Sequence, residues 1–182
     1  MAMFALVLGG IGLSGGATTA ETSATIDFMG NVRNTGYHAT IHKGGFFGSF
    51  IDDESNPYVI LREFDEITRY VDEIMTTFRR DTAIVPDGYW ESIEQNVREF
   101  HARYDEDFFK QNILVIAIVD RGSGNVSYDV ENVRLDTEGI VTVDVNKKAP
   151  MIQTMDFVHW VLFLELDRAV YNDVTSINIE LS

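Results

Sequence analysis

The run from Ile113 to Val119 constrains the fold more than any other part of the sequence. It reads Ile-Leu-Val-Ile-Ala-Ile-Val, so a strand formed here has no polar face. A β-strand that is apolar on both faces has to be covered on both sides. We therefore predict that this strand lies at the centre of the fold, with other elements packed above and below it.

Other strands are predicted around it. The segment from Phe157 to Leu166 is also apolar on both faces, so we expect it beside the first strand. The other predicted strands, most of which alternate apolar and polar residues, are Tyr37–Ile41, Tyr58–Leu61, Val126–Leu135, Val141–Asn146 and Ile177–Leu181. The apolar positions change parity after Val130, which predicts a β-bulge near Glu131 and Asn132. We place the strands from Tyr37 to Ile41 and from Ile177 to Leu181 at edges.

Two segments show the three- and four-residue spacing of amphipathic helices. The apolar stripe of the first consists of Phe64, Ile67, Val71, Ile74, Met75 and Phe78, and that of the second of Trp90, Ile93, Val97, Phe100 and Tyr104. Pro86 and Gly88 separate them, and the second helix is predicted from about Tyr89 to Arg103. The sequence thus predicts an α+β fold, with two amphipathic helices packed on a mainly antiparallel sheet of about five or six short strands.

Composition limits the class of protein. A chain of 182 residues with 45% apolar residues is long enough to bury one sizeable core, and we expect a single domain over residues 26–182. The absence of cysteine excludes disulfides, thiolate zinc sites and cysteine nucleophiles in this chain. The formal charge of -15 disfavours nucleic acid and anionic membrane surfaces as partners, because both repel a negative field.

Residues 1–24 differ from the rest of the chain. An apolar run from Met3 to Leu13 is followed by small polar residues, with cleavage expected after Ala20 or Ala24. This order is typical of a secretory signal, and the apolar run is too short to span a bilayer. We expect an exported, extracytoplasmic protein; the alternatives are that the segment is disordered or packs on the core.

Two polar motifs are interpreted as structural. The segment Gly122-Ser123-Gly124-Asn125 follows a strand, but it lacks the lysine and the following helix of a phosphate-binding loop. We interpret it as a hairpin turn in which glycine and asparagine supply positive φ. The acidic run Asp105–Asp107 lacks the spacing of a calcium loop, so it is expected to cap a short helical turn before Phe108.

The histidines give weak signals for a metal site. His38 and His42 lie on a predicted strand, where a four-residue offset separates them by about 13 Å. Asp156, His159 and Glu165 form the other candidate cluster, but His159 and Glu165 would be about 20 Å apart along a strand. A polar network that anchors the adjacent loop explains these residues better than a metal. The sequence therefore predicts no catalytic, cofactor-binding or metal-binding residues and no cofactor.

One part of the chain resembles a known family. The run YDEDFF, NILVIAIV and GSGNVSYDVENV, followed by Pro150 and by Thr154, Asp156, Trp160 and Glu165, resembles uncharacterised exported bacterial proteins and lipoproteins. These proteins are in turn similar to the C-terminal domain of the protease complex subunit PrcB. The resemblance covers Tyr104 to about Asp167, with a weaker fit over Tyr58–Phe78. It implies a compact α+β domain with a non-catalytic accessory role. This chain has no cysteine for lipid attachment.

The sequence therefore favours an exported, non-enzymatic accessory domain that binds another extracytoplasmic protein. Two alternatives stay open. The first is a metal-dependent hydrolase that uses His159 and Asp156 with another histidine. The second is a small-ligand carrier lined by Phe46, Phe47, Trp90 or Trp160, because aromatic side chains line pockets as readily as cores.

Overall fold

The computed structural model describes residues 18–20, 25–26, 32–33, 36–44, 57–81, 89–151 and 157–182. The helices are α1 (Phe64–Asp81), α2 (Tyr89–Arg103), α3 (Glu106–Gln111) and α4 (Arg168–Tyr171). The strands are β1 (Thr18–Ala20), β2 (Thr25–Ile26), β3 (Val32–Arg33), β4 (Tyr37–Gly44), β5 (Tyr58–Leu61), β6 (Asn112–Ser123), β7 (Ser127–Leu135), β8 (Ile140–Lys148), β9 (Phe157–Asp167) and β10 (Ser176–Leu181). None of the helices in these ranges is both long and apolar enough to cross a bilayer.

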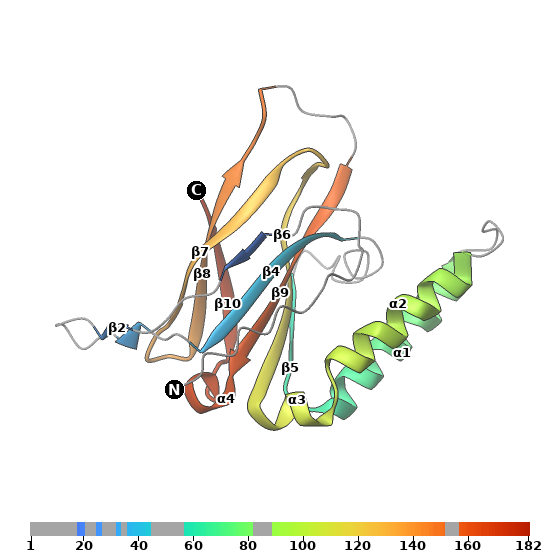
Figure 1. Ribbon diagram of the computed structural model, residues 1–182, viewed down its shortest axis with the longest axis horizontal. Helices are drawn as coiled ribbons and strands as arrows, with labels where there is room; N and C mark the ends of the chain where they lie inside the picture. The colour runs from blue at the N-terminus through green and yellow to red at the C-terminus, as the bar shows by residue number, and fades with distance from the viewer. Residues whose placement is uncertain are drawn as a thin grey trace, which may run out of the picture.

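The elements form layers (Figure 1). A five-stranded sheet in the order β1-β4-β9-β6-β5 packs one face against a three-stranded sheet in the order β10-β8-β7. Helices α1 and α2 lie on its other face, and β2 pairs only with β3. The predicted α+β class is confirmed, and among the described strands each pair is antiparallel except β10 with β8. The expected single sheet is in fact divided into two.

The prediction for the apolar strand is confirmed in β6. Its odd-numbered residues, such as Val115, belong to the core between the two sheets, which we call the inter-sheet core. Its even-numbered residues, such as Ile116, belong to a second core beneath the helices, which we call the helix-side core. Strand β9 pairs with β6 as predicted and is the middle strand of the sheet, so it too is covered on both faces.

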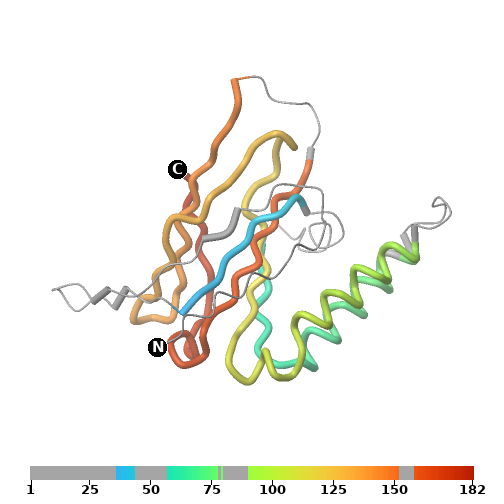
Figure 2. The backbone as a smooth tube through the Cα atoms, viewed as in Figure 1, coloured from blue at the N-terminus to red at the C-terminus, as the bar shows by residue number. Residues whose placement is uncertain are grey.

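Strands from distant parts of the chain lie side by side in the larger sheet. Figure 2 shows β4, from the first quarter of the chain, next to β9. The edge position expected for this strand is wrong, because β4 lies between β1 and β9. The pairing is antiparallel and regular, with His38 opposite Glu165 and His42 opposite Val161. Because Ala39 and Ile41 point into the inter-sheet core, His38 and His42 point to the helix side of the sheet.

Helix α2 has its predicted range, and α1 spans the apolar stripe predicted for the first helix. The buried residues of α1 and α2 include Ile67, Val71 and Phe100, which pack in the helix-side core. The Asp105 carboxylate accepts a hydrogen bond of 2.9 Å from the Phe108 backbone N–H, so the expected cap of α3 is confirmed.

The turns are partly as expected. The register of β7 against β8 shifts between Val130 and Asn132, which confirms the predicted bulge. The turn predicted at Gly122–Asn125 starts later, because β6 continues to Ser123. The expected positive φ at Gly124 is wrong: within the described ranges only Gly139 has one, with φ +82°. The Val126 N–H donates to the Ser123 carbonyl at 3.3 Å, and a four-residue turn of this kind forms with negative φ at its central residues.

Candidate functional site

The candidate metal ligands of the sequence analysis do not form one cluster in the structure. Asp156 lies outside the described residues. His159 and Glu165 share a face of β9, but His159 is opposite Gly44 while Glu165 is opposite His38. The strand therefore keeps His159 and Glu165 apart, as their spacing predicts, and brings Glu165 to a histidine of β4 instead. Within the described ranges no group of three His, Asp or Glu side chains could hold a metal ion.

The partners of Glu165 come from two other elements. We call Glu165, His38, Arg103 and Tyr104 the Glu165 cluster. The Arg103 Nη2 donates to Glu165 Oε1 at 2.7 Å, and the Tyr104 hydroxyl donates to the same oxygen at 3.2 Å. The His38 Nδ1 lies 3.4 Å from Glu165 Oε2. With 18% of its side chain exposed, Glu165 joins β9 to β4 and to the end of α2.

Local packing fixes the donors in this cluster. The Tyr104 backbone N–H donates to the Phe100 carbonyl at 3.0 Å, which continues the last turn of α2. The two rings then meet edge to face with centroids 4.9 Å apart, and Phe100 contacts Phe163 of β9 in the same way. Because these rings pack between the helix and the sheet, the Tyr104 hydroxyl is held toward Glu165.

The electrostatics keep Glu165 ionised. Partial burial opposes ionisation, but the contact with His38 and the positive charge and hydrogen bond of Arg103 outweigh it and hold the pKa of Glu165 below its ordinary value. Burial and the charge of Glu165 raise the pKa of Tyr104, which stays a hydrogen-bond donor. Burial and the positive charge of Arg103 lower the pKa of His42. The cluster therefore fastens α2 to the sheet and leaves Glu165 without the raised pKa that a general acid needs.

This arrangement predicts a pH effect on stability. Since the pKa of Glu165 is lowered by folding, its contribution is fully present above the pKa of the unfolded chain, near 4.3 by the ordinary value for glutamate, and is lost as the pH falls through the lowered pKa. We expect Glu165→Gln to reduce the free energy of unfolding at pH 7 by about 1–3 kcal/mol, because hydrogen bonds to a charged group are lost.

Urea denaturation at several pH values measures this effect. The difference between the wild type and Glu165→Gln should shrink as the pH falls from about 5 to about 3. The variant Glu99→Gln, on the polar side of α2, serves as the control, since the Glu99 carboxylate accepts a solvent-exposed hydrogen bond from Gln95 there. A difference that is the same at every pH would contradict the assignment.

The tryptophans expected to line a pocket lie far apart in the fold. Trp160 is 3% exposed and packs in the inter-sheet core, with its ring centroid 5.1 Å from that of Tyr128. Trp90 lies on α2, where the Arg79 guanidinium sits 5.9 Å from its ring centroid. Phe46 and Phe47 lie outside the described residues. The structure therefore does not bring Trp90 and Trp160 to one pocket.

Sequence reasoning missed a second polar cluster at the end of the inter-sheet core. The Tyr128 hydroxyl and the Lys147 ammonium both donate to Asp120 Oδ2 at 2.5 Å. The register of β6 against β9 shifts between Ile118 and Asp120, which turns Asp120 toward the other sheet. The signal in the sequence was the end of the apolar run at Asp120, but its partners depend on how the two sheets stack.

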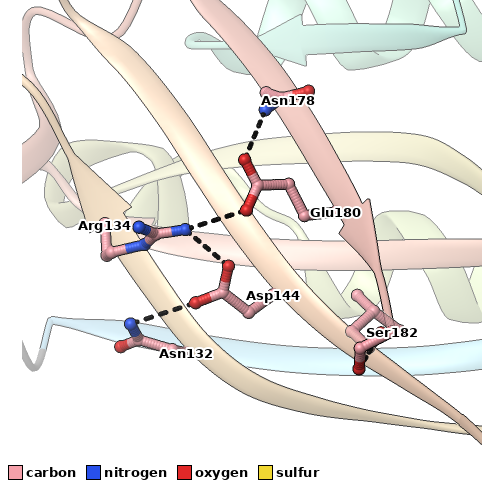
Figure 3. A network of polar contacts seen from close by, with 7 residues as sticks. Asn132, Arg134, Asp144, Asn178, Glu180 and Ser182 are labelled. Carbon is pink, nitrogen blue, oxygen red and sulfur yellow. Dashed lines mark hydrogen bonds and ion pairs between the residues drawn. The ribbon is translucent and has the colours of Figure 1, made fainter.

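A third polar network covers the side of the three-stranded sheet that faces away from the inter-sheet core. We call this side the outer face. Arg134 of β7 contacts Asp144 of β8 at 2.6 Å and Glu180 of β10 at 3.2 Å (Figure 3). Asn132 donates to Asp144, and Asn178 donates to Glu180, both at 3.2 Å. The outer face therefore carries polar side chains that fix one another across three strands.

Comparisons with known proteins add no relatives. No family model, curated protein sequence or solved structure matches the chain.

Proposed function

We propose that the protein is an exported, non-enzymatic accessory domain that binds another extracytoplasmic protein through its outer face. The observation that carries this proposal is the arrangement of that face. It lies on a sheet backed by the inter-sheet core, and no described element covers it. The apolar run from Met3 to Leu13 supports export, whereas the pairing of Thr18–Ala20 with β4 fits the alternative that part of this segment packs on the core. The resemblance of the chain to PrcB-like exported proteins supports an accessory role.

The outer face has a fixed pattern of charge. Its carboxylates are those of Asp129, Glu131, Asp144 and Glu180, and its cations are Arg134 and Lys148. Lys148 pairs with Asp129, and Asn146 donates to Glu131 at 2.9 Å. Because the carboxylates outnumber the cations, the surface that fits this face is one with an excess of positive charge.

The pairing of side chains within the outer face lowers the entropic cost of binding a partner. Long charged side chains lose rotamer freedom when a partner orders them, at a cost of about 0.5–1.5 kcal/mol each. On the outer face Arg134 is already held by two carboxylates on neighbouring strands. A partner therefore meets side chains that are largely in place, which reduces the entropic cost of binding.

Affinity capture with matched charge variants tests the proposal. The full chain is immobilised and exposed to an extracytoplasmic extract of the producing organism, and the bound proteins are quantified by mass spectrometry. The outer-face variant is Glu131→Lys with Glu180→Lys. The control is Asp72→Lys with Glu73→Lys on α1, which changes the net charge equally at exposed positions in the helix layer.

We expect a protein that the wild type and the helix control retain but the outer-face variant loses, with binding that weakens as salt increases. Equal capture by all three proteins, or loss with the helix control alone, would place the binding surface elsewhere. Turnover of a substrate by the purified chain would contradict the non-enzymatic role.

A further inference from the structure

The edges of the two sheets differ in how well they are protected. An exposed edge strand is a template for pairing with another chain, and natural proteins protect it with bulges, proline or short length. Among the described edges, β1 has 3 residues, β5 has 4 and begins directly after Pro57, and β7 has a bulge. Strand β10 has 6 residues, no proline and an unbroken register with β8. Strand β10 is therefore the edge best suited to pairing.

The hydrogen bonds of Ser182 show which backbone groups of β10 point away from β8. The Ser182 N–H donates to the Val145 carbonyl, and the Ser182 carbonyl accepts from the Lys147 N–H, each at 3.0 Å. In a regular ladder the direction of the backbone groups alternates along the strand. The N–H and C=O groups of Ile177, Ile179 and Leu181 therefore point outward, and no strand within the described ranges pairs with them.

The sequence of β10 complements itself when two copies run antiparallel. With Ile179 opposite Ile179, each Ile177 faces Leu181 of the other copy. All three of these residues have outward backbone groups, so each opposed pair exchanges hydrogen bonds as antiparallel pairing requires. On the inner side the apolar stripe becomes continuous and covers Leu181, which is 45% exposed in the single chain.

The charges on the outer side select this register. With Ile179 on the two-fold axis, Glu180 of each copy lies opposite Asn178 of the other. Moving the axis to Glu180 would place the two carboxylates opposite each other, which is unfavourable. Moving it to Asn178 would place Leu181 opposite Thr175, which lies outside β10. The register with Ile179 on the axis therefore pairs the outward backbone groups, continues the apolar stripe and keeps the carboxylates apart.

We propose that two copies of the chain associate through antiparallel pairing of β10 about a two-fold axis at Ile179. The contact is isologous, since the same strand serves on both sides, and it joins the two three-stranded sheets into one continuous sheet. Because each copy carries a formal charge of -15, long-range repulsion opposes the association. Salt screens that repulsion, so the dimer is expected to become tighter as salt increases.

Sedimentation velocity of the full chain over a range of concentrations, at about 0.05 to 0.5 M NaCl, tests the proposal. The variant Ile179→Pro removes an N–H that points outward and leaves the ladder to β8 intact, so it should be monomeric with a normal melting transition. A chain that is monomeric at all salt concentrations, or an Ile179→Pro variant that dimerises like the wild type, would overturn the proposal.

A charge exchange tests the register itself and stands even if Ile179→Pro fails to fold. Asn178→Glu places like charges opposite each other in the dimer and should raise its dissociation constant roughly tenfold. The double variant Asn178→Glu with Glu180→Asn restores the opposite pairing and should recover the affinity of the wild type. Failure of the double variant to recover would overturn the register. Self-association is measured on the purified chain alone, so its failure is separate from any failure of the outer face to capture a partner.

Discussion

Replacing Ile116 with aspartate is expected to abolish cooperative folding. Ile116 is 0% exposed and lies in the helix-side core, opposite Val59 of β5 and Phe163 of β9. A carboxylate at this position would be buried without a partner, and the packing of the isoleucine side chain would be lost as well. The combined cost exceeds about 5 kcal/mol, which is comparable with the whole stability of a domain of this size.

Circular dichroism during thermal unfolding measures this effect. The control is Ser127→Asp, which introduces the same residue at an exposed position of β7 and should melt like the wild type. A cooperative transition in Ile116→Asp near the wild-type temperature would show that β6 is not enclosed between the helices and the second sheet.

The second large effect is expected for Gly139→Ala. Gly139 has φ +82°, where a side chain is strained, and an added Cβ would lie 2.4 Å from the Asp173 carbonyl oxygen. The Thr175 N–H also donates to the Gly139 carbonyl at 2.7 Å, so the turn between β7 and β8 is docked on the segment that leads into β10. We expect a loss of about 2–4 kcal/mol, because the backbone strain and the contact act together.

Gly122→Ala is the matched control for this substitution. Its φ lies outside the positive range, and an added Cβ would be 3.5 Å from the nearest Asp120 oxygen, which is an ordinary contact. The control should therefore be neutral or slightly stabilising in urea denaturation. Equal destabilisation by the two substitutions would contradict the role of backbone strain at Gly139.

Local patterns in the sequence were enough to predict most of the longer helices and strands and some of their details. The three- and four-residue spacing of apolar residues marked both long helices, and the parity change after Val130 marked the bulge of β7. The apolar run of β6 indicated that both of its faces are covered, because alternate residues of a strand face opposite sides of the sheet. These features depend on residues close together in the chain.

Features that depend on distant residues were not predicted. The alternation in β7 and β8 shows that one face of their sheet is buried, but a layer of helices and a second sheet can cover a buried face equally well. The division into two sheets was therefore missed. The contact of His38 with Glu165 follows from the register of β4 on β9, which no local signal specifies. The conformation of Gly124 was wrong because several types of turn fit the same residues.

The position of β9 in the chain has a consequence for folding. It separates β4 from β6 in the larger sheet, yet it is formed by residues 157–167, long after both of its neighbours. Neither neighbour can complete its pairing until β9 has been synthesised, so the sheet cannot close while only residues 1–156 are available. Contacts with such long sequence separation slow folding. A newly made chain is therefore expected to stay without its larger sheet until residues 157–167 have been synthesised, and to expose the apolar face of β6 during that time.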